Sequence, residues 1–222
     1  TGTAQRQVSS SGHYTCATDA AGDVECWGHS DRAAPPADTA FLQISSGEFH
    51  GCGIKAADQQ VACWGNNNNP ATQVGQATPP SGGDQFLQIS SSRTHTCGIL
   101  ADGTQGASCW GSNEFGKSTP PADVGFLQVS AGGSFTCGIL DDDTKEVNCW
   151  GYNADGQATP PSGVGFLQIS AGGFHVCGVK SDGTDEAACW ACGNPYTQVG
   201  QAEPPAGIGF LQAVSYTHLT LP

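Results

Sequence analysis

The chain has 222 residues, and its 20 acidic and 7 basic residues give a formal net charge of −13 at pH 7. This balance argues against a nucleic-acid-binding protein, which needs a basic surface to displace phosphate counterions. Only 12% of the residues are charged and 32 are glycine, so turn-rich β structure is expected rather than long helices. No apolar run approaches the roughly 20 residues that a membrane span requires.

One phrase recurs along the chain and divides it into units of 40 to 45 residues. FLQIS or FLQVS begins at Phe41, Phe86, Phe126 and Phe166, and a shorter FLQ begins at Phe210. Such a period indicates stacked structural repeats. We therefore expect one repeat domain over residues 1–212, with units beginning near residues 1, 41, 86, 126 and 166. The tail, residues 213–222, matches nothing in the repeat and is interpreted as adapter-derived or non-native sequence.

Each unit is predicted to contain β-strands joined by short turns. In one unit FLQIS, FHVCGVK and EAACWG are the predicted strands, and SAGG and SDGT are the turns between them. Alternation in FLQIS predicts Leu and Ile on one face and Phe and Gln on the other. The segment YNADGQATPP has room for a fourth, short edge strand before its prolines. Three or four strands in about 40 residues are typical of a propeller blade, so the fold class is all-β, a propeller or partial propeller.

Ten of the eleven cysteines recur at fixed places in these units. The second cysteine of each unit always precedes tryptophan, and only the turn between the two cysteines changes length. This pattern is typical of residues that face each other across a hairpin. We predict five cross-strand disulfides, each stabilising by roughly 3 kcal/mol: Cys16–Cys26, Cys52–Cys63, Cys97–Cys109, Cys137–Cys149 and Cys177–Cys189. Because disulfides persist outside reducing compartments, an extracellular or cell-surface location is expected.

The eleventh cysteine, Cys192, has no counterpart in the other units. Three fates are left open: a bridge to a cysteine outside this sequence, a bridge to another molecule, or a free thiol. Cys189 and Cys192 have the spacing of a metal or redox pair, but no second such pair exists and Cys189 already has a hairpin partner. No metal site is therefore predicted here.

The phrases QISAGGFHVCGVKSDGTDEAACW and CWGYNADGQAT resemble the repeat of the regulator-of-chromosome-condensation (RCC1-like) family. The resemblance covers residues 8–212 and implies a propeller, typically of seven blades. Five hairpins are visible, so an incomplete ring, a smaller ring or an open array is expected. The resemblance also implies that one tryptophan per unit packs within the blades: Trp27, Trp64, Trp110, Trp150 and Trp190. The family does not share one function, so the fold alone implies none.

The remaining polar motifs indicate structure rather than chemistry. His50, His95 and His175 precede the first cysteine by two residues, but Tyr14 and Phe135 hold the same place in other units. Since Phe cannot ligate a metal, these rings are expected to pack between blades. DDDTKE, at 141–146, is expected to be a solvated hairpin tip. No catalytic motif is present, and we predict neither enzymatic activity nor a cofactor.

A threonine precedes the double proline in three units, at Thr78, Thr119 and Thr159. Double proline favours an extended segment that ends one blade and begins the next. In an extracellular protein the same threonines are possible sites of O-linked glycosylation. The structural interpretation is favoured, and both can hold together.

These features predict a secreted or cell-surface, non-enzymatic repeat protein that serves adhesion, partner binding or an extracellular assembly as a structural subunit. Variable loops such as NNNNPATQV and CGNPYTQV would present the binding surface from one rim. A carbohydrate-binding propeller is an alternative, which would expose Tyr152 and Tyr196 on one rim. Another is a protein-binding propeller acting as an inhibitor or a GTPase exchange factor. The partner, a protein or a glycan, is not identified by the sequence, and self-assembly is also open.

Overall fold

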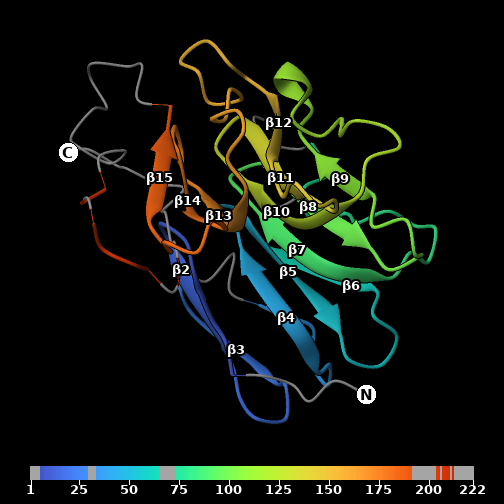
Figure 1. Ribbon diagram of the computed structural model, residues 1–222. Helices are drawn as coiled ribbons and strands as arrows, with labels where there is room; N and C mark the ends of the chain where they lie inside the picture. Colours follow the sequence, from blue (N-terminus) through green and yellow to red (C-terminus); the bar gives the residue numbers. More distant parts are fainter. Residues whose placement is uncertain are drawn as a thin grey trace.

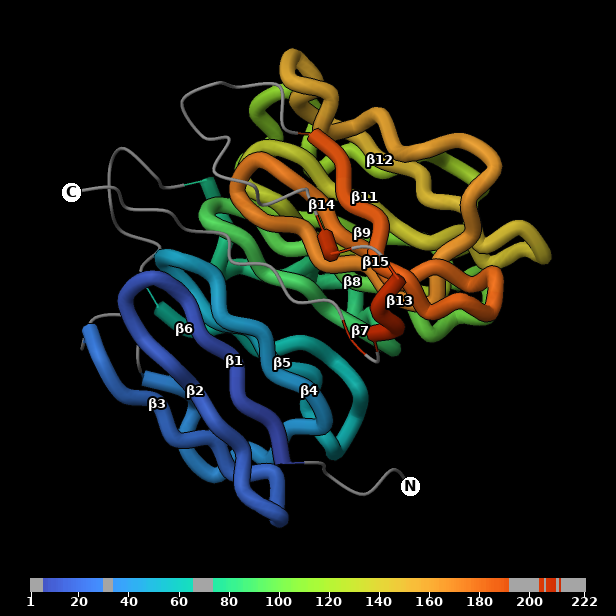
Figure 2. The backbone as a smooth tube through the Cα atoms, turned by 60° about the vertical axis from the view of Figure 1, so that its left-hand side comes forward, coloured from blue at the N-terminus to red at the C-terminus, as the bar shows by residue number. Residues whose placement is uncertain are grey.

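The computed structural model describes residues 6–29, 34–65, 74–191, 204–205, 207–210 and 212. Within these ranges, fifteen strands form five three-stranded antiparallel sheets, which we call blades 1 to 5 in chain order (Figure 1). Each blade is a meander in which the second strand lies between the first and the third. Figure 2 shows the same succession of blades, from blue to orange, in a second view.

The strands occupy equivalent places in each blade. The first strands are β1 (Val8–Ser10), β4 (Phe41–Ser46), β7 (Phe86–Ser91), β10 (Phe126–Ala131) and β13 (Phe166–Ala171). The second strands are β2 (Tyr14–Thr18), β5 (His50–Lys55), β8 (His95–Leu100), β11 (Phe135–Leu140) and β14 (Val176–Lys180). The third strands are β3 (Val24–Gly28), β6 (Val61–Gly65), β9 (Ala107–Gly111), β12 (Val147–Gly151) and β15 (Ala187–Trp190).

The fourth strand that the sequence allowed is absent from the described part of each unit. After the third strands, the described residues form turns and one short 3-10 helix, η2 (Glu114–Gly116). Double prolines follow these turns and cannot donate to a strand ladder. The blades therefore have three strands, and the segments after the third strands are loops.

A β-bulge overturns the predicted alternation of FLQIS. In blade 3, Phe86 pairs with Leu100 and Gln88 pairs with Ile99, so Leu87 is an extra residue in the register. Side chains alternate between the two faces of a strand, so one extra residue shifts all later side chains to the opposite face. Phe86 and Ile89 are consequently both buried, whereas Leu87 is 56% exposed. The prediction that Leu and Ile share a face was wrong, and the same bulge occurs in blades 2, 4 and 5.

The hydrophobic core lies between blades rather than within one. Tyr14 and Cys16 of blade 1 pack with Phe41, Ile44 and Trp64 of blade 2, and three further clusters join the later blades in the same way. One three-stranded sheet is too small to bury such side chains alone. The array is therefore held together by contacts between neighbouring blades.

Four of the five tryptophans pack as the repeat predicts. In blades 2 to 5 the Trp ring lies 5.6–5.8 Å from the first phenylalanine of its own blade. The indole Nε1 of Trp110, Trp150 and Trp190 also donates to a backbone carbonyl in the loop of the preceding blade. Trp27 differs, because its side chain is 54% exposed.

Glutamine side chains join the first strands of neighbouring blades. Gln43 donates from Nε2 to the carbonyl of Ile89 (3.2 Å) and accepts at Oε1 from the Ile89 amide (2.9 Å). The side-chain carboxamide thus takes the place of a peptide group and provides hydrogen-bond partners for the free amide and carbonyl on the outward edge of the next strand. The same exchange links Gln88 to Val129 and Gln128 to Ile169, while Gln7 binds Leu42 and Ile44.

Serine two residues further along adds a second rung. The hydroxyl of Ser45 accepts from the Ser91 amide at 2.8 Å. Equivalent bonds join Ser9 to Ser46, Ser90 to Ala131 and Ser130 to Ala171, at 2.8–3.0 Å. We call the combined set of Gln7, Gln43, Gln88 and Gln128 with Ser9, Ser45, Ser90 and Ser130 the Gln–Ser ladder.

The five predicted disulfides are present, one in each blade. Each joins directly opposed residues of the second and third strands, as in the Cys137–Cys149 register pair. The remaining bridges are Cys16–Cys26, Cys52–Cys63, Cys97–Cys109 and Cys177–Cys189. Cys192 and the tail 213–222 lie outside the described residues.

Replacing Gln88 by Met should destabilise the array, because the amide and carbonyl of Val129 would lose their partners while the side-chain length is kept. We expect a loss of about 2–4 kcal/mol in the free energy of unfolding, measured by guanidinium denaturation. Gln85→Met is the matched control, since Gln85 is exposed and its side chain makes one exposed bond, from Nε2 to the carbonyl of Asp58. Equal stability of the two variants would contradict a structural role for the Gln–Ser ladder.

Removing one bridge should also lower stability. The paired change Cys97→Ala and Cys109→Ala opens a loop closed over a separation of 12 residues, so a loss of roughly 3 kcal/mol is expected. Cys192→Ala serves as the control and should leave the unfolding midpoint unchanged. Mass spectrometry before and after reduction counts the bridges, and fewer than four in the untreated chain would refute the assignment.

Candidate functional site

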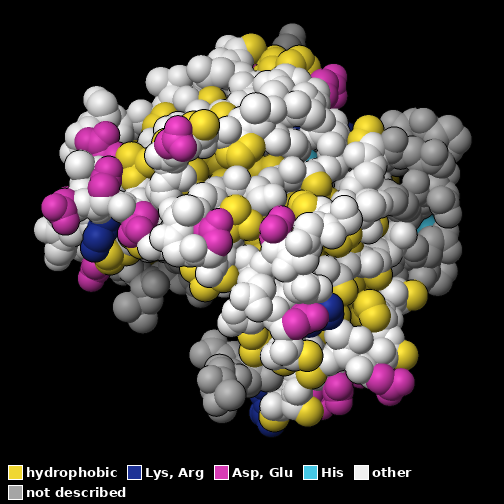
Figure 3. All heavy atoms as spheres, turned by 90° about the vertical axis from the view of Figure 1, so that its right-hand side faces the viewer, with side chains coloured by type: hydrophobic (Ala, Val, Ile, Leu, Met, Phe, Trp, Pro, Cys, Tyr) yellow, Lys and Arg dark blue, Asp and Glu magenta, His cyan; other side chains and the backbone are white. Residues whose placement is uncertain are grey.

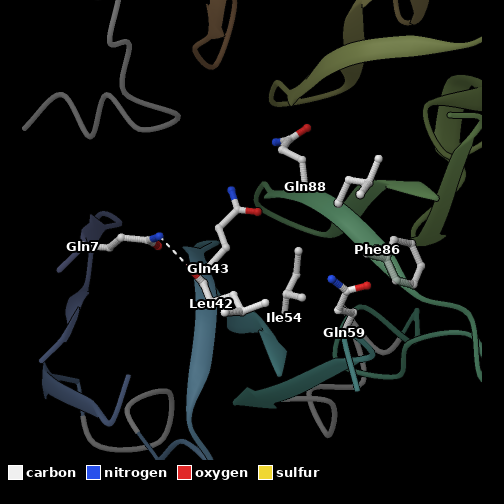
Figure 4. A pocket seen from close by; sticks show the side chains of 8 residues that line it. Gln7, Leu42, Gln43, Ile54, Gln59, Phe86 and Gln88 are labelled. Atoms are coloured by element: carbon white, nitrogen blue, oxygen red, sulfur yellow. Dashed lines mark hydrogen bonds between the residues drawn. The ribbon is translucent and has the colours of Figure 1, made fainter. Parts of the chain in front are cut away.

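A pocket of about 320 Å³ lies where blades 2 and 3 meet, near the beginning of their first strands (Figure 4). Gln7, Leu42, Gln43, Ile54, Gln59, Phe86, Leu87 and Gln88 line it. Figure 4 shows the Gln7 carboxamide directed at the Leu42 backbone, a bond of 2.9 Å. The carboxamides of Gln7, Gln43 and Gln88 belong to the Gln–Ser ladder, and no lining residue titrates near neutral pH. The pocket therefore resembles a gap between blades more than a reaction site.

Two buried histidines bind threonines of the next blade. His50 Nε2 lies 2.7 Å from Thr96 Oγ1, and His95 Nε2 lies 2.8 Å from Thr136 Oγ1. Complete burial lowers the pKa of each ring to about 3, so both are neutral at physiological pH. These contacts agree with the predicted packing role.

The equivalent place in blade 4 is apolar on both sides. Phe135 packs in one cluster with Val176 of blade 5, the residue equivalent to Thr136. His175 is only partly buried, and burial lowers its pKa as well. Among the described residues, no group of three or more His, Cys, Asp or Glu side chains has the arrangement of a metal site.

A buried carboxylate connects the turns of three blades. Glu48 of blade 2 lies 2.9 Å from Nε of Arg93 in blade 3 and 3.5 Å from Nε2 of His13 in blade 1. The Arg93 guanidinium also lies over the Phe49 ring, 5.7 Å from its centroid. This cluster sits in the turns between first and second strands and is interpreted as a structural link.

The acidic hairpin tips are closed by their own hydrogen bonds. Asp142 accepts from the amide and hydroxyl of Thr144, and Asp102 and Asp182 do the same with Thr104 and Thr184. The threonine hydroxyls hold the pKa of these exposed carboxyl groups below the usual range. Residues 141–146 thus form a solvated tip, as predicted.

The candidate glycosylation sites are exposed, and hydrogen bonds engage the hydroxyls of Thr119 and Thr159. Thr119 Oγ1 accepts from Nδ2 of Asn113 at 2.9 Å, and Thr159 Oγ1 accepts from Nδ2 of Asn153 at 3.0 Å. A sugar on either oxygen would compete with this loop contact. Thr78 is also exposed, and glycosylation at all three positions stays a prediction.

An aromatic pair is the most unusual feature of the loops after the third strands. Phe115 is 56% exposed and its ring centroid lies 4.9 Å from that of Tyr152, a partly buried residue of the next blade. Phe115 adopts φ 63°, a left-handed conformation that costs a bulky residue roughly 1–3 kcal/mol. Sequence reasoning singled out Tyr152 but missed Phe115; Tyr196 lies outside the described residues.

A lysine stands in place of glutamine two residues after Phe115. In blades 2 and 4, Gln76 and Gln157 accept at Oε1 from the amide two residues earlier. Lys117 holds that place in blade 3, and its ammonium has no acceptor with which to bind the Phe115 amide. Its Nζ instead donates to Thr94 Oγ1 at 3.1 Å, and burial lowers its pKa. The substitution of Lys for Gln was the available sequence signal.

Comparison with known proteins identifies the repeat. The profile of the regulator of chromosome condensation (RCC1) repeat matches residues 41–69, 86–117 and 126–157. The Arabidopsis thaliana serine/threonine-protein kinase-like protein CCR4 is 44% identical over 54 residues, which are 24% of this chain and 7% of that protein.

Solved structures share the architecture. The ectodomain of the Physcomitrella patens receptor kinase CR4 superposes with a TM-score of 0.70 at 30% identity, covering 84% of this chain and 51% of the ectodomain. The ACR4 ectodomain of Arabidopsis thaliana gives 0.54 at 24% identity, covering 95% and 91% of the two chains. Prp20p of Saccharomyces cerevisiae gives 0.65 at 16% identity, covering 83% and 57%, and shows the shared fold alone.

The chain thus spans about half the length of the moss ectodomain and a small part of the kinase-like protein. The described part of the chain contains no helix with the length and hydropathy of a membrane span. The five blade disulfides and the similarity to receptor-kinase ectodomains are consistent with an extracellular location.

The buried histidines predict a loss of stability in mild acid. Their native pKa of about 3 lies below the unfolded value of about 6.5, so only the unfolded state binds protons as the pH falls below 6.5. The stability that the two neutral histidines contribute to the folded state is complete above pH 6.5 and is lost as the pH falls from 6.5 to about 3. For each histidine, the free energy of unfolding should fall by about 2 kcal/mol when the pH is lowered from 7 to 5.

The test copies the apolar pair of the next interface. His95→Phe with Thr136→Val, which imitates Phe135 and Val176, should make the change in unfolding free energy between pH 7 and pH 5 smaller by about 2 kcal/mol. Denaturation at both pH values measures this. An unchanged pH dependence would mean that His95 is not held neutral in the folded state.

Proposed function

We propose that this chain, whose repeats belong to the RCC1 repeat family, is the partner-binding part of an extracellular or cell-surface protein of the receptor-ectodomain type. Its role is recognition of another macromolecule rather than catalysis. The rigid blades position the loops, and the loops make the contacts.

One observation carries this proposal: every blade contains its own disulfide. Five bridges of this kind are not maintained in a reducing cytosol, whereas small secreted domains use them routinely. The 30% identity to the CR4 ectodomain over most of the chain supports the same compartment and the same kind of protein.

The loops after the third strands have the properties of recognition elements. In blades 3 and 4 they share one frame, in which Asn113 and Asn153 accept at Oδ1 from the amides of Ser118 and Ala158. Between these fixed points the residues differ, as the exposed Phe115 and the half-buried Asp155 do. A constant frame with variable exposed residues is how binding loops are displayed on a scaffold.

The alternatives receive less support from specific residues. Similarity to Prp20p is at the level of the fold, so it does not favour a GTPase exchange factor. A carbohydrate-binding surface would use exposed flat rings, whereas Tyr152 is partly covered and packs against Phe115 at a tilt of 57°.

The compartment is tested by thiol accessibility. The chain is produced once through the secretory pathway and once in a reducing cytosol, and both samples are alkylated under native conditions. We expect ten protected cysteines and a cooperative unfolding transition only for the secreted chain. An equally stable cytosolic chain with ten reactive thiols would contradict the proposal.

A further inference from the structure

The loops after β9 and β12 are built on the same hydrogen bonds. In blade 3, Gly116 N donates to Asn113 O and Thr119 N donates to Gly116 O. In blade 4, Gly156, Asn153 and Thr159 form the equivalent two bonds. Because the two loops share these backbone hydrogen bonds, a difference in their conformation can be attributed to the residues that differ between them.

The backbones of the two loops differ between the asparagine and the glycine three residues later, that is, within 113–116 and 153–156. Gln157 Oε1 accepts from the Asp155 amide at 3.0 Å, and Asp155 is not among the residues with positive φ. Lys117 cannot accept from the equivalent Phe115 amide, and there φ is 63°. In this conformation the Phe115 ring lies against Tyr152 of the next blade.

The result is an aromatic pair at the junction of blades 3 and 4, formed by the exposed Phe115 and the partly buried Tyr152, which we call the Phe115–Tyr152 notch. The two ring planes are inclined by 57°, so the rings do not share the flat face on which a pyranose would stack. The rings are in direct contact with each other, and Phe115, which is 56% exposed, offers an aromatic surface of the kind over which a cation binds.

Charge favours the same ligand. Glu114 and Asp155 belong to the two loops that carry the rings, and the whole chain has 20 acidic and 7 basic residues. Figure 3 shows one face of the molecule, where Asp and Glu side chains outnumber Lys and Arg. Of the nearby basic groups, Arg93 pairs with Glu48. Lys117 donates to Thr94 and keeps its charge, so Glu114 and Asp155 leave a local excess of one negative charge.

We propose that the Phe115–Tyr152 notch, with Glu114 and Asp155, binds a Lys or Arg side chain of a protein partner, and that Lys117 is the positioning residue that creates it. This inference rests on the proposed function and specifies the chemistry of the partner: a basic segment, steered by the acidic surface and held by contact with the two rings.

The test uses the whole disulfide-bonded chain with ¹³C-labelled tyrosine rings, and tetra-arginine as the probe. We expect saturable shifts of the Tyr152 resonance that weaken as salt is added. Lys117→Gln and Phe115→Ala should each weaken binding by about tenfold or more. Val74→Ala is the matched control, because Val74 occupies the equivalent loop position in blade 2, and it should bind as the parent does.

Lys117→Gln is the sharper variant, since it keeps both aromatic rings and restores the glutamine found in blades 2 and 4. Unchanged tetra-arginine affinity in this variant would overturn the positioning role. Perturbation of Tyr152 by cellotetraose but not by tetra-arginine would overturn the cationic ligand and favour a glycan. An absence of any response would overturn the site.

These results are separable from the test of compartment. A secreted chain with ten protected cysteines that ignores tetra-arginine would retain the proposed extracellular function and refute only this site. If the cytosolic chain with ten reactive thiols is equally stable and also binds tetra-arginine, this site is retained and the proposed extracellular function is refuted.

Discussion

The structure depends on how the unpaired edge of each first strand is satisfied. One edge of that strand pairs with the second strand of its own blade, and the other edge faces the neighbouring blade with amides and carbonyls that need partners. Gln43 supplies a carboxamide to Ile89, and Ser45 supplies a hydroxyl to Ser91. The Gln–Ser ladder therefore links blades that share no backbone hydrogen bonds between their first strands, and it sets their relative register.

The bonds within a blade are of a different kind. The disulfide fixes the second strand to the third, where a three-stranded sheet alone would be marginal. The contacts between blades include the Gln–Ser ladder and shared apolar clusters, such as the one in which Cys97 and Ile99 pack with Phe126. They also include the bonds from indole Nε1 to the preceding loop, as from Trp150 to Lys117. Because the covalent bridges lie in the outer hairpins and the polar ladder joins the first strands, neither constrains the loops that follow the third strands.

Much of this could be predicted from the sequence, for identifiable reasons. The hairpin disulfides followed from cysteine spacing, since length changes fell only in the turn. The bulge at Leu87 could not be predicted, because alternation within five residues is the same with and without an inserted residue. The roles of Gln43 and Phe115 were also missed. The former bonds across 46 residues, and the latter depends on an acceptor that Lys117 lacks.

The loop position held by Gln or Lys explains how such an array can vary its surface without losing its fold. Trp150 Nε1 donates to the carbonyl of Lys117 (2.9 Å), and Trp190 Nε1 donates to that of Gln157 (3.2 Å). The contact between blades thus uses the backbone at this position and leaves the side chain free to change. A single replacement then alters the adjacent turn and brings Phe115 onto Tyr152, while the Asn113 frame and the indole bond stay in place. Recognition can therefore diversify in the loops while the contacts between blades remain constant.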